Sequence, residues 1–176
     1  NVNHYYTTGF ELGFRYRKLL TYGEYIYNNI SRYIYGANNQ KTDLKNAVFN
    51  GWYATASYMI LGENRQYSPD EAEFGPMKGR RNGGNLEFAA RISNINMNDL
   101  HDPAAYITGG KATSYSASLN WYPVRNVVIG LNYIYMNNDK YADSKGQITK
   151  GGKPLSEVMP SGIDFNVFQL RSMISF

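Results

Sequence analysis

The residues best suited to chemistry are charged side chains that stand opposite the large apolar side chains in segments of alternating pattern. They are Glu11, Glu24, Glu63, Glu87, Arg15, Arg17, Arg91 and Arg171. A row of acidic side chains that faces a row of basic side chains across water would create a transverse electric field and paths for counter-ions. The same residues could instead form cross-strand ion pairs that stiffen a wall. Because acids and bases are equal in number, this set alone indicates no preference for anions.

Further positive side chains gather in the polar stretch 138–162. Four lysines stand there: Lys140, Lys145, Lys150 and Lys153. They outnumber the acidic residues Asp139, Asp143 and Glu157 by one. This excess could attract anions to the mouth of a passage at long range. A solvated surface loop is the simpler interpretation of the same composition.

The sequence offers little for catalysis or metal binding. It has no cysteine, and His4 and His101 stand far apart, with no carboxylate spaced as in a zinc site or a catalytic triad. The glycines near residue 80 lack the strand and helix that a phosphate-binding loop requires. The net charge is only +4 and the basic residues form no stripe, which argues against a nucleic-acid partner. We therefore expect no enzyme, no cofactor and no metal.

An alternation of residue types identifies the elements that position the charged side chains. In residues 6–17 the even positions hold Tyr, Thr, Phe, Leu, Phe and Tyr, and the odd positions hold Thr, Gly, Glu, Gly, Arg and Arg. A strand keeps two such sets on opposite faces, whereas a helix would mix them. The pattern predicts seven strands, at about 4–17, 20–34, 46–61, 84–96, 111–122, 126–137 and 163–176. Helix signals are weak, so the predicted fold class is all-β.

The connections between these strands are of two kinds. Residues 17–19 and 123–125 form tight turns, whereas residues 35–45, 97–110 and 138–162 form long polar loops. Short turns at one end and long loops at the other are typical of outer-membrane barrels, although soluble sandwiches also have unequal loops. Residues 62–83 should lie at the short-turn end, yet they are long. Pro69, Gly75 and Pro76 predict that they contain no further strands.

The distribution of aromatic residues indicates which face is wet. Tyr, Phe and Trp make up 15% of the chain and often stand near the ends of the apolar faces, as Tyr6, Trp52 and Trp121 do. A small soluble barrel would have to pack these rings inside, where few fit. Rings near strand ends suit the interfacial girdles of a membrane barrel. A terminal strand ending in Phe176 also resembles the insertion signal of Gram-negative outer-membrane barrels. The pattern favours a transmembrane antiparallel β-barrel over a soluble sandwich.

The chain resembles one family, the phosphate-selective porin O and P type of outer-membrane porin, in its Bacteroidetes form. The most specific matching block is residues 51–65, GWYATASYMILGENR; residues 85–93, 109–111, 119–123 and 169–176 match in the same order. The resemblance spans about residues 5–176 and implies a sixteen-stranded, trimeric barrel that passes anions. In this family arginines and lysines around a constriction set selectivity. No individual phosphate-binding residue is carried over to this chain.

The resemblance therefore implies that residues 1–176 are the C-terminal portion of a single barrel in the outer membrane of a Gram-negative bacterium. An odd number of strands also implies that at least one more precedes them. The implied function is passive diffusion of small hydrophilic solutes, with phosphate or other anions preferred. Expected partners are these solutes, outer-membrane lipid and lipopolysaccharide, and further copies in a homotrimer. The alternative is a structural or interaction barrel without an open pore, bound to a surface lipoprotein or a secretion partner.

Overall fold

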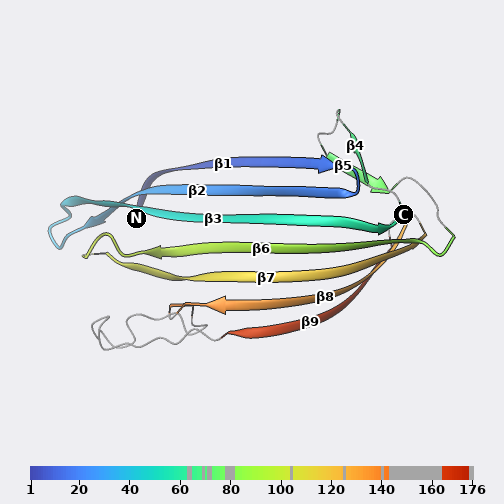
Figure 1. The fold of residues 1–176 in the computed structure, drawn as a ribbon. Coiled ribbons are helices and arrows are strands. Elements are labelled where there is room, and N and C mark those ends of the chain that lie inside the picture. Colours follow the sequence, from blue (N-terminus) through green and yellow to red (C-terminus); the bar gives the residue numbers. More distant parts are fainter. Residues whose placement is uncertain are drawn as a thin grey trace.

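Figure 1 shows the computed structural model of the protein, which describes residues 1–62, 65–68, 70, 73–77, 82–103, 105–124, 126–139, 141–142 and 164–174. The strands in these ranges are β1 (Val2–Tyr16), β2 (Leu19–Tyr35), β3 (Lys41–Leu61), β4 (Arg65–Ser68), β5 (Glu73–Met77), β6 (Asn85–Asp99), β7 (Ile107–Val124), β8 (Val127–Asn138) and β9 (Phe165–Ile174). No helix in the described part of the chain is long and apolar enough to cross a membrane.

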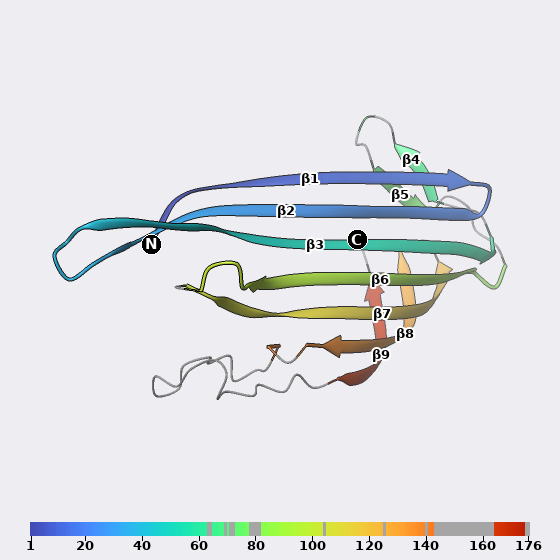
Figure 2. The same cartoon turned by 60° about the vertical axis from the view of Figure 1, so that its left-hand side comes forward.

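Seven of the strands form one sheet in the order β1-β2-β3-β6-β7-β8-β9. All neighbouring pairs in it are antiparallel. The predicted all-β class and the seven predicted strands are confirmed. The sheet curves strongly, and in Figure 2 β8 and β9 run at a steep angle to β1, β2 and β3. Within the described strands, β1 and β9 form its two edges.

The strands at the loop end run further than the sequence pattern predicted. Tyr35 pairs with Lys41, so only residues 36–40 separate β2 from β3, and most of the predicted loop 35–45 is strand. Likewise, β6 continues to Asp99 and β7 begins at Ile107, which shortens the predicted loop 97–110. The reason is that polar side chains do not prevent a backbone ladder, because its hydrogen bonds join main-chain N–H and C=O groups. Polarity was therefore a poor guide to where these strands end.

A hairpin lies between β3 and β6, where the prolines predicted no strands. β4 and β5 form a separate two-stranded antiparallel sheet. Tyr67 pairs with Phe74 and Arg65 with Met77, so Gly75 and Pro76 together stand opposite a single residue. Proline lacks the backbone N–H that a regular ladder uses, but it is tolerated at such a bulge and on an edge. The prediction was wrong because it treated proline as excluding every kind of strand.

In the middle strands of the seven-stranded sheet, one face is more shielded than the other, whereas β1 and β9 are exposed on both faces. Along the middle of β3, buried or half-buried residues alternate with exposed residues. The apolar side chains are on the exposed face, with exposures of 38% for Trp52, 44% for Phe88, 41% for Leu119 and 76% for Leu170. They do not meet in a dry centre. An apolar face of this extent requires an apolar surrounding such as lipid.

A buried carboxylate fixes the connection between β6 and β7 to β3. Asp99 is 1% exposed and accepts hydrogen bonds from the backbone N–H of Val48 at 2.8 Å and of His101 at 3.0 Å. The carboxylate of Asp102 accepts a third hydrogen bond, from the backbone N–H of Lys45 at 3.2 Å. Satisfied polar groups of this kind hold neighbouring strands in register. They position the loop ends of the strands that carry the polar face.

Candidate functional site

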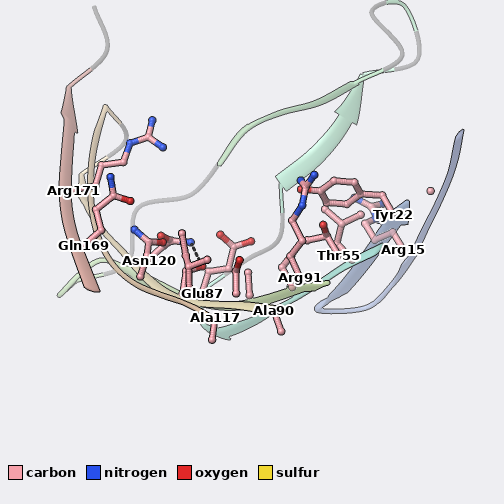
Figure 3. A pocket seen from close by; sticks show the side chains of 18 of the residues that line it. Arg15, Tyr22, Thr55, Glu87, Ala90, Arg91, Ala117, Asn120, Gln169 and Arg171 are labelled. Carbon is pink, nitrogen blue, oxygen red and sulfur yellow. Dashed lines mark hydrogen bonds between the residues drawn. The ribbon is translucent and has the colours of Figure 1, made fainter. Parts of the chain in front are cut away.

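The concave face of the sheet carries polar side chains from all seven strands (Figure 3). Residues that pair across the strands share a face, so the register orders them in rows. One row reads Gly13, Tyr22, Thr55, Arg91, Ser116, Ile134 and Val167. The next reads Arg15, Leu20, Ser57, Ala89, Ser118, Asn132 and Gln169. Residues of both rows line an open hollow of about 1010 Å³.

Six of the charged residues singled out in the sequence lie on this concave face. They are Glu11, Arg15, Glu24, Glu87, Arg91 and Arg171. Figure 3 shows Glu87, Arg91 and Arg171 on the concave side, whereas Ala90 and Ala117 point to the convex side. The fold thus gathers charges from β1, β6 and β9 around one hollow.

Arg91 of β6 is held by aromatic rings. Its guanidinium carbon lies 3.8 Å from the centre of the Tyr53 ring on β3. The Tyr53 ring meets that of Tyr22 on β2 edge to face, with 6.1 Å between ring centres and 81° between ring planes. A cation over a ring face is attracted by the ring quadrupole, and a stacked guanidinium keeps its N–H donors at its rim. Arg91 can therefore donate hydrogen bonds into the hollow from a fixed position.

Two glutamates lie opposite each other on the same face. Glu11 of β1 pairs with Glu24 of β2, which in turn pairs with Tyr53 of β3. Carboxylates directly across a strand pair repel each other unless positive charge or a proton lies near. Arg15, which lines the same hollow, is on this face four positions further along β1. Charges of both signs therefore face the hollow at the β1–β2 side.

Glu87 has a drier environment at the turn end of the sheet. The Tyr122 hydroxyl donates a hydrogen bond to the Glu87 carboxylate at 2.6 Å, and both residues are buried. Met59 packs against Tyr122, and Val128 packs against both. A short bond to a charged acceptor is among the stronger hydrogen bonds in proteins. Glu87 is therefore partly withdrawn from the water of the hollow, unlike the exposed arginines.

Arg171 lies at the other side of the hollow, on β9. Its pairing partner is Gly130, which has no side chain to cover it. One guanidinium nitrogen donates to the sulfur of Met173 at 3.3 Å. Between Arg171 and Arg91 the face consists of small hydroxyl and amide side chains, among them Ser116, Ser118, Asn120, Asn132 and Gln169. These groups offer a continuous polar surface between the two cations.

Of the remaining predicted residues, the structure describes only Arg17, and it lies outside the concave face. Arg17 occupies the tight turn after β1 with a φ of 51°, and its guanidinium carbon lies 5.3 Å from the centre of the Tyr16 ring. Tyr16 belongs to the convex face, so Arg17 lies outside the polar rows. The others lie outside the described residues: Glu63, Lys140, Lys145, Lys150, Lys153 and the terminal Phe176.

Sequence reasoning passed over the neutral part of the site. Tyr22 and Tyr53 alternate in step with the charged residues of their strands, so the signal was present, but only charged residues were selected. Tyr67 of β4 also lines the hollow, and it could not be assigned because no strand was predicted there. Among the described residues, no group of three or more His, Asp and Glu side chains could hold a metal ion.

A curved antiparallel sheet with a polar concave face and an aromatic, exposed convex face is the architecture of a membrane β-barrel wall. Comparison with known proteins identifies the family: the family model "Phosphate-selective porin O and P" matches residues 1–159, and this chain belongs to that family. The chain is 30% identical over 122 residues to Porin O of Pseudomonas aeruginosa. That match covers 66% of this chain and 27% of the relative, so it spans about a quarter of the relative's length.

Proposed function

We propose that this chain forms part of the wall of an outer-membrane porin in a Gram-negative bacterium, through which small hydrophilic solutes diffuse passively. The observation that carries the proposal is the division of the sheet into a polar concave face and an exposed apolar convex face. Only closed barrels and helices satisfy backbone groups inside a bilayer. In a closed barrel, further strands would join the edges β1 and β9 of the described sheet, and we place residues 1–176 in the C-terminal portion of such a barrel.

We further propose that solutes pass along the concave face and that anions are preferred. Family membership supports this, as does an asymmetry among the charges. Arg15, Arg91 and Arg171 are exposed to the hollow, whereas of the two glutamates that line it Glu11 is exposed and the Glu87 carboxylate is buried against Tyr122. Arginine side chains facing water favour the entry of anions, and neighbouring hydroxyl groups can replace part of an anion's hydration. The equal numbers of acids and bases in the sequence therefore understate the positive field of this face.

The test is conductance of the full-length protein in planar bilayers under a salt gradient. The proposal predicts stepwise conductance and a reversal potential that indicates anion preference. Replacing Arg91 with Gln should shift the reversal potential toward cations, because it removes one lumenal charge. Lys111→Gln is the matched control, since it removes one positive charge from the convex face. Equal shifts in the two variants, or none in either, would contradict the assignment of the concave face to the pore.

The interaction barrel remains the alternative function, and it makes an opposite prediction. It predicts a lipoprotein or secretion subunit that co-purifies with the protein, and no ion conductance in planar bilayers at any voltage. The open hollow of about 1010 Å³ in the described part of the chain favours the pore instead. We also propose that the protein forms a homotrimer, which sedimentation in detergent can test.

A further inference from the structure

An apolar groove lies on the convex face of the sheet, over β1, β2, β3, β6, β7 and β8. It has a volume of about 870 Å³. Its floor consists of the small residues Gly23, Ala54, Ala56, Ala90 and Ala117. Aromatic rings from β1, β2, β7 and β8 form its walls, including those of Phe14 and Tyr115. Ala90 and Ala117 project to this side of the sheet in Figure 3.

The shape of the groove follows from the order of side chains across the strands. One convex row runs Phe14, Thr21, Ala56, Ala90, Ala117, Tyr133 and Phe168, so three small residues are bounded by rings on one side and a threonine and a ring on the other. Gly23, in the neighbouring row, has no side chain and so makes the groove deeper there. A Cβ atom added at Gly23 would lie 2.6 Å from the backbone oxygen of Tyr53. A depression in a lipid-facing surface loses dispersion contacts unless something of matching width fills it.

In the described strands, one lysine lies on this convex face between the row of Asn50 and the turn end. Lys111 of β7 is exposed and pairs with Asn96 of β6, in the row of Asn50. From this row to the turn end, it is the only Asp, Glu, Lys or Arg among the convex-face residues of the described strands. Asp139, which follows β8, uses its carboxylate for hydrogen bonds from the Asn98 side chain and the Tyr141 backbone N–H.

The separation of Lys111 and the groove matches one lipid leaflet. Ala117 is six positions along β7 from Lys111, which is about 20 Å along a strand. With a strand tilt of about 40°, this corresponds to a depth of roughly 15 Å, close to half the apolar band of a barrel. A chain that begins at Lys111 and runs inward would pass Tyr115 and reach the groove floor at Ala117.

We propose that the groove seats an acyl chain of a phosphorylated outer-leaflet lipid whose headgroup phosphate is bound at Lys111. This rests on the membrane placement proposed above. Charge complementarity selects the occupant: from the row of Asn50 to the turn end, the convex face of the described strands has one cation, Lys111, beside asparagine amides. Long lysine side chains at this depth reach the interface, where their charge remains hydrated and can contact phosphate. A phosphorylated lipid supplies both features at once, an anionic headgroup for Lys111 and an apolar chain for the groove.

The experiment measures binding of lipid A to the full-length protein in detergent by native mass spectrometry, with diphosphorylated and dephosphorylated lipid A as the two probes. Lys111→Gln should weaken binding of the diphosphorylated lipid about fivefold, the effect of one basic residue near an anionic surface, and leave the dephosphorylated lipid unchanged. Ala117→Phe fills the groove and should weaken both lipids by about threefold, through lost dispersion contacts. The matched controls are Lys41→Gln at the loop end and Leu170→Phe on the convex face of β9, and neither should change binding.

Three results would overturn this proposal. Unchanged affinity in both variants would mean that lipid contacts the convex face without a defined site. Weaker binding in Lys111→Gln alone would mean a headgroup contact without an acyl-chain groove. A changed oligomeric state in Ala117→Phe, with lipid affinity intact, would assign the groove to a second copy of the chain. Bilayer conductance of the same preparations distinguishes failure of the lipid-site proposal from failure of the pore proposal. If the variants conduct ions and bind lipid with unchanged affinity, the lipid site is contradicted and the pore is not.

Discussion

The guanidinium of Arg91 stacks on the ring of Tyr53, at 3.8 Å from its centre, although the β4–β5 hairpin separates the two residues in the chain. The register pairs Arg91 with Thr55, so the contact is diagonal across β3 and β6. Diagonal neighbours in a sheet are within reach of long and aromatic side chains. Tyr53 therefore acts as a positioning residue for a cation that faces the hollow.

Replacing Tyr53 with Leu should reduce anion preference without changing the number of charges in the hollow. The stack is worth about 0.5–2 kcal/mol, and without it Arg91 would sample several positions. Tyr53→Phe should retain most of the preference, because the ring face makes the contact and the hydroxyl does not. Reversal potentials of the two variants in planar bilayers check this. Equal losses in both would mean that the hydroxyl matters and the stack does not.

Replacing Tyr122 with Phe should destabilise the protein by about 1–3 kcal/mol, because it leaves the buried Glu87 carboxylate without this donor. The measurement is urea unfolding of the detergent-solubilised protein, followed by tryptophan fluorescence. Tyr115→Phe is the control, since it removes a hydroxyl from the exposed convex face. Adding Glu87→Gln to Tyr122→Phe should recover part of the loss. No recovery would show that charge burial is not the cause.

Gly110 is held in a conformation that other residues rarely adopt. Its φ is +89°, and a Cβ atom there would lie 2.7 Å from the Cα atom of Ala142. Gly110→Ala should therefore cost about 1–3 kcal/mol of stability, measured as a lower unfolding midpoint. Gly9→Ala is the control, because the nearest atom to its added Cβ is a Glu24 carboxylate oxygen at 3.9 Å. Similar midpoints for the two variants would contradict the assignment of strain to Gly110.

Acid should weaken the connection between β8 and β9. The carboxylate of Asp164 accepts hydrogen bonds from the backbone N–H of Asn138 at 2.8 Å and from the hydroxyl of Tyr135 and the amide of Asn137, each at 3.0 Å. These bonds, the backbone one foremost, hold the pKa of Asp164 below its ordinary value of 3.8. A lowered folded-state pKa stabilises the protein at pH values above 3.8, and that stability disappears as pH falls through the lowered value.

Asp164→Asn provides the measurement of this effect. The unchanged protein should exceed the variant in unfolding midpoint at about pH 6, and the difference should narrow as the pH falls below about 4. A difference that stays constant over this range would show that the carboxylate charge contributes nothing to the β8–β9 connection.

The alternation of residues was enough to predict the strands and their two faces. The sets Glu11, Gly13 and Arg15, and Glu87, Ala89 and Arg91, each have a period of two, and a helix would turn residues two positions apart to different faces. Residues that pair across neighbouring strands lie on the same face of the sheet. Assigning the polar and apolar faces of each strand therefore also assigned the polar and apolar faces of the whole sheet. The composition of the hollow could be inferred in outline for the same reason.

The other features depend on interactions that a single strand pattern does not contain. The Arg91–Tyr53 stack depends on the register between β3 and β6, and register cannot be read from either strand alone. The β4–β5 hairpin depends on a bulge at Gly75 and Pro76. At a bulge, proline's missing backbone N–H does not interrupt a regular ladder of hydrogen bonds. Arg17 falls outside the polar rows because a two-residue hairpin turn requires a positive φ there, and this changes where the side chain points.

Cysteine accessibility at two adjacent residues of β7 tests the central claim about the two faces most directly. The chain has no cysteine, so Ser116→Cys and Ala117→Cys each introduce one reporter into it. The account predicts that a membrane-impermeant thiol reagent labels Ser116→Cys in reconstituted full-length protein and leaves Ala117→Cys unlabelled until detergent replaces the bilayer. Labelling of Ala117→Cys in the intact bilayer, with Ser116→Cys protected, would contradict it.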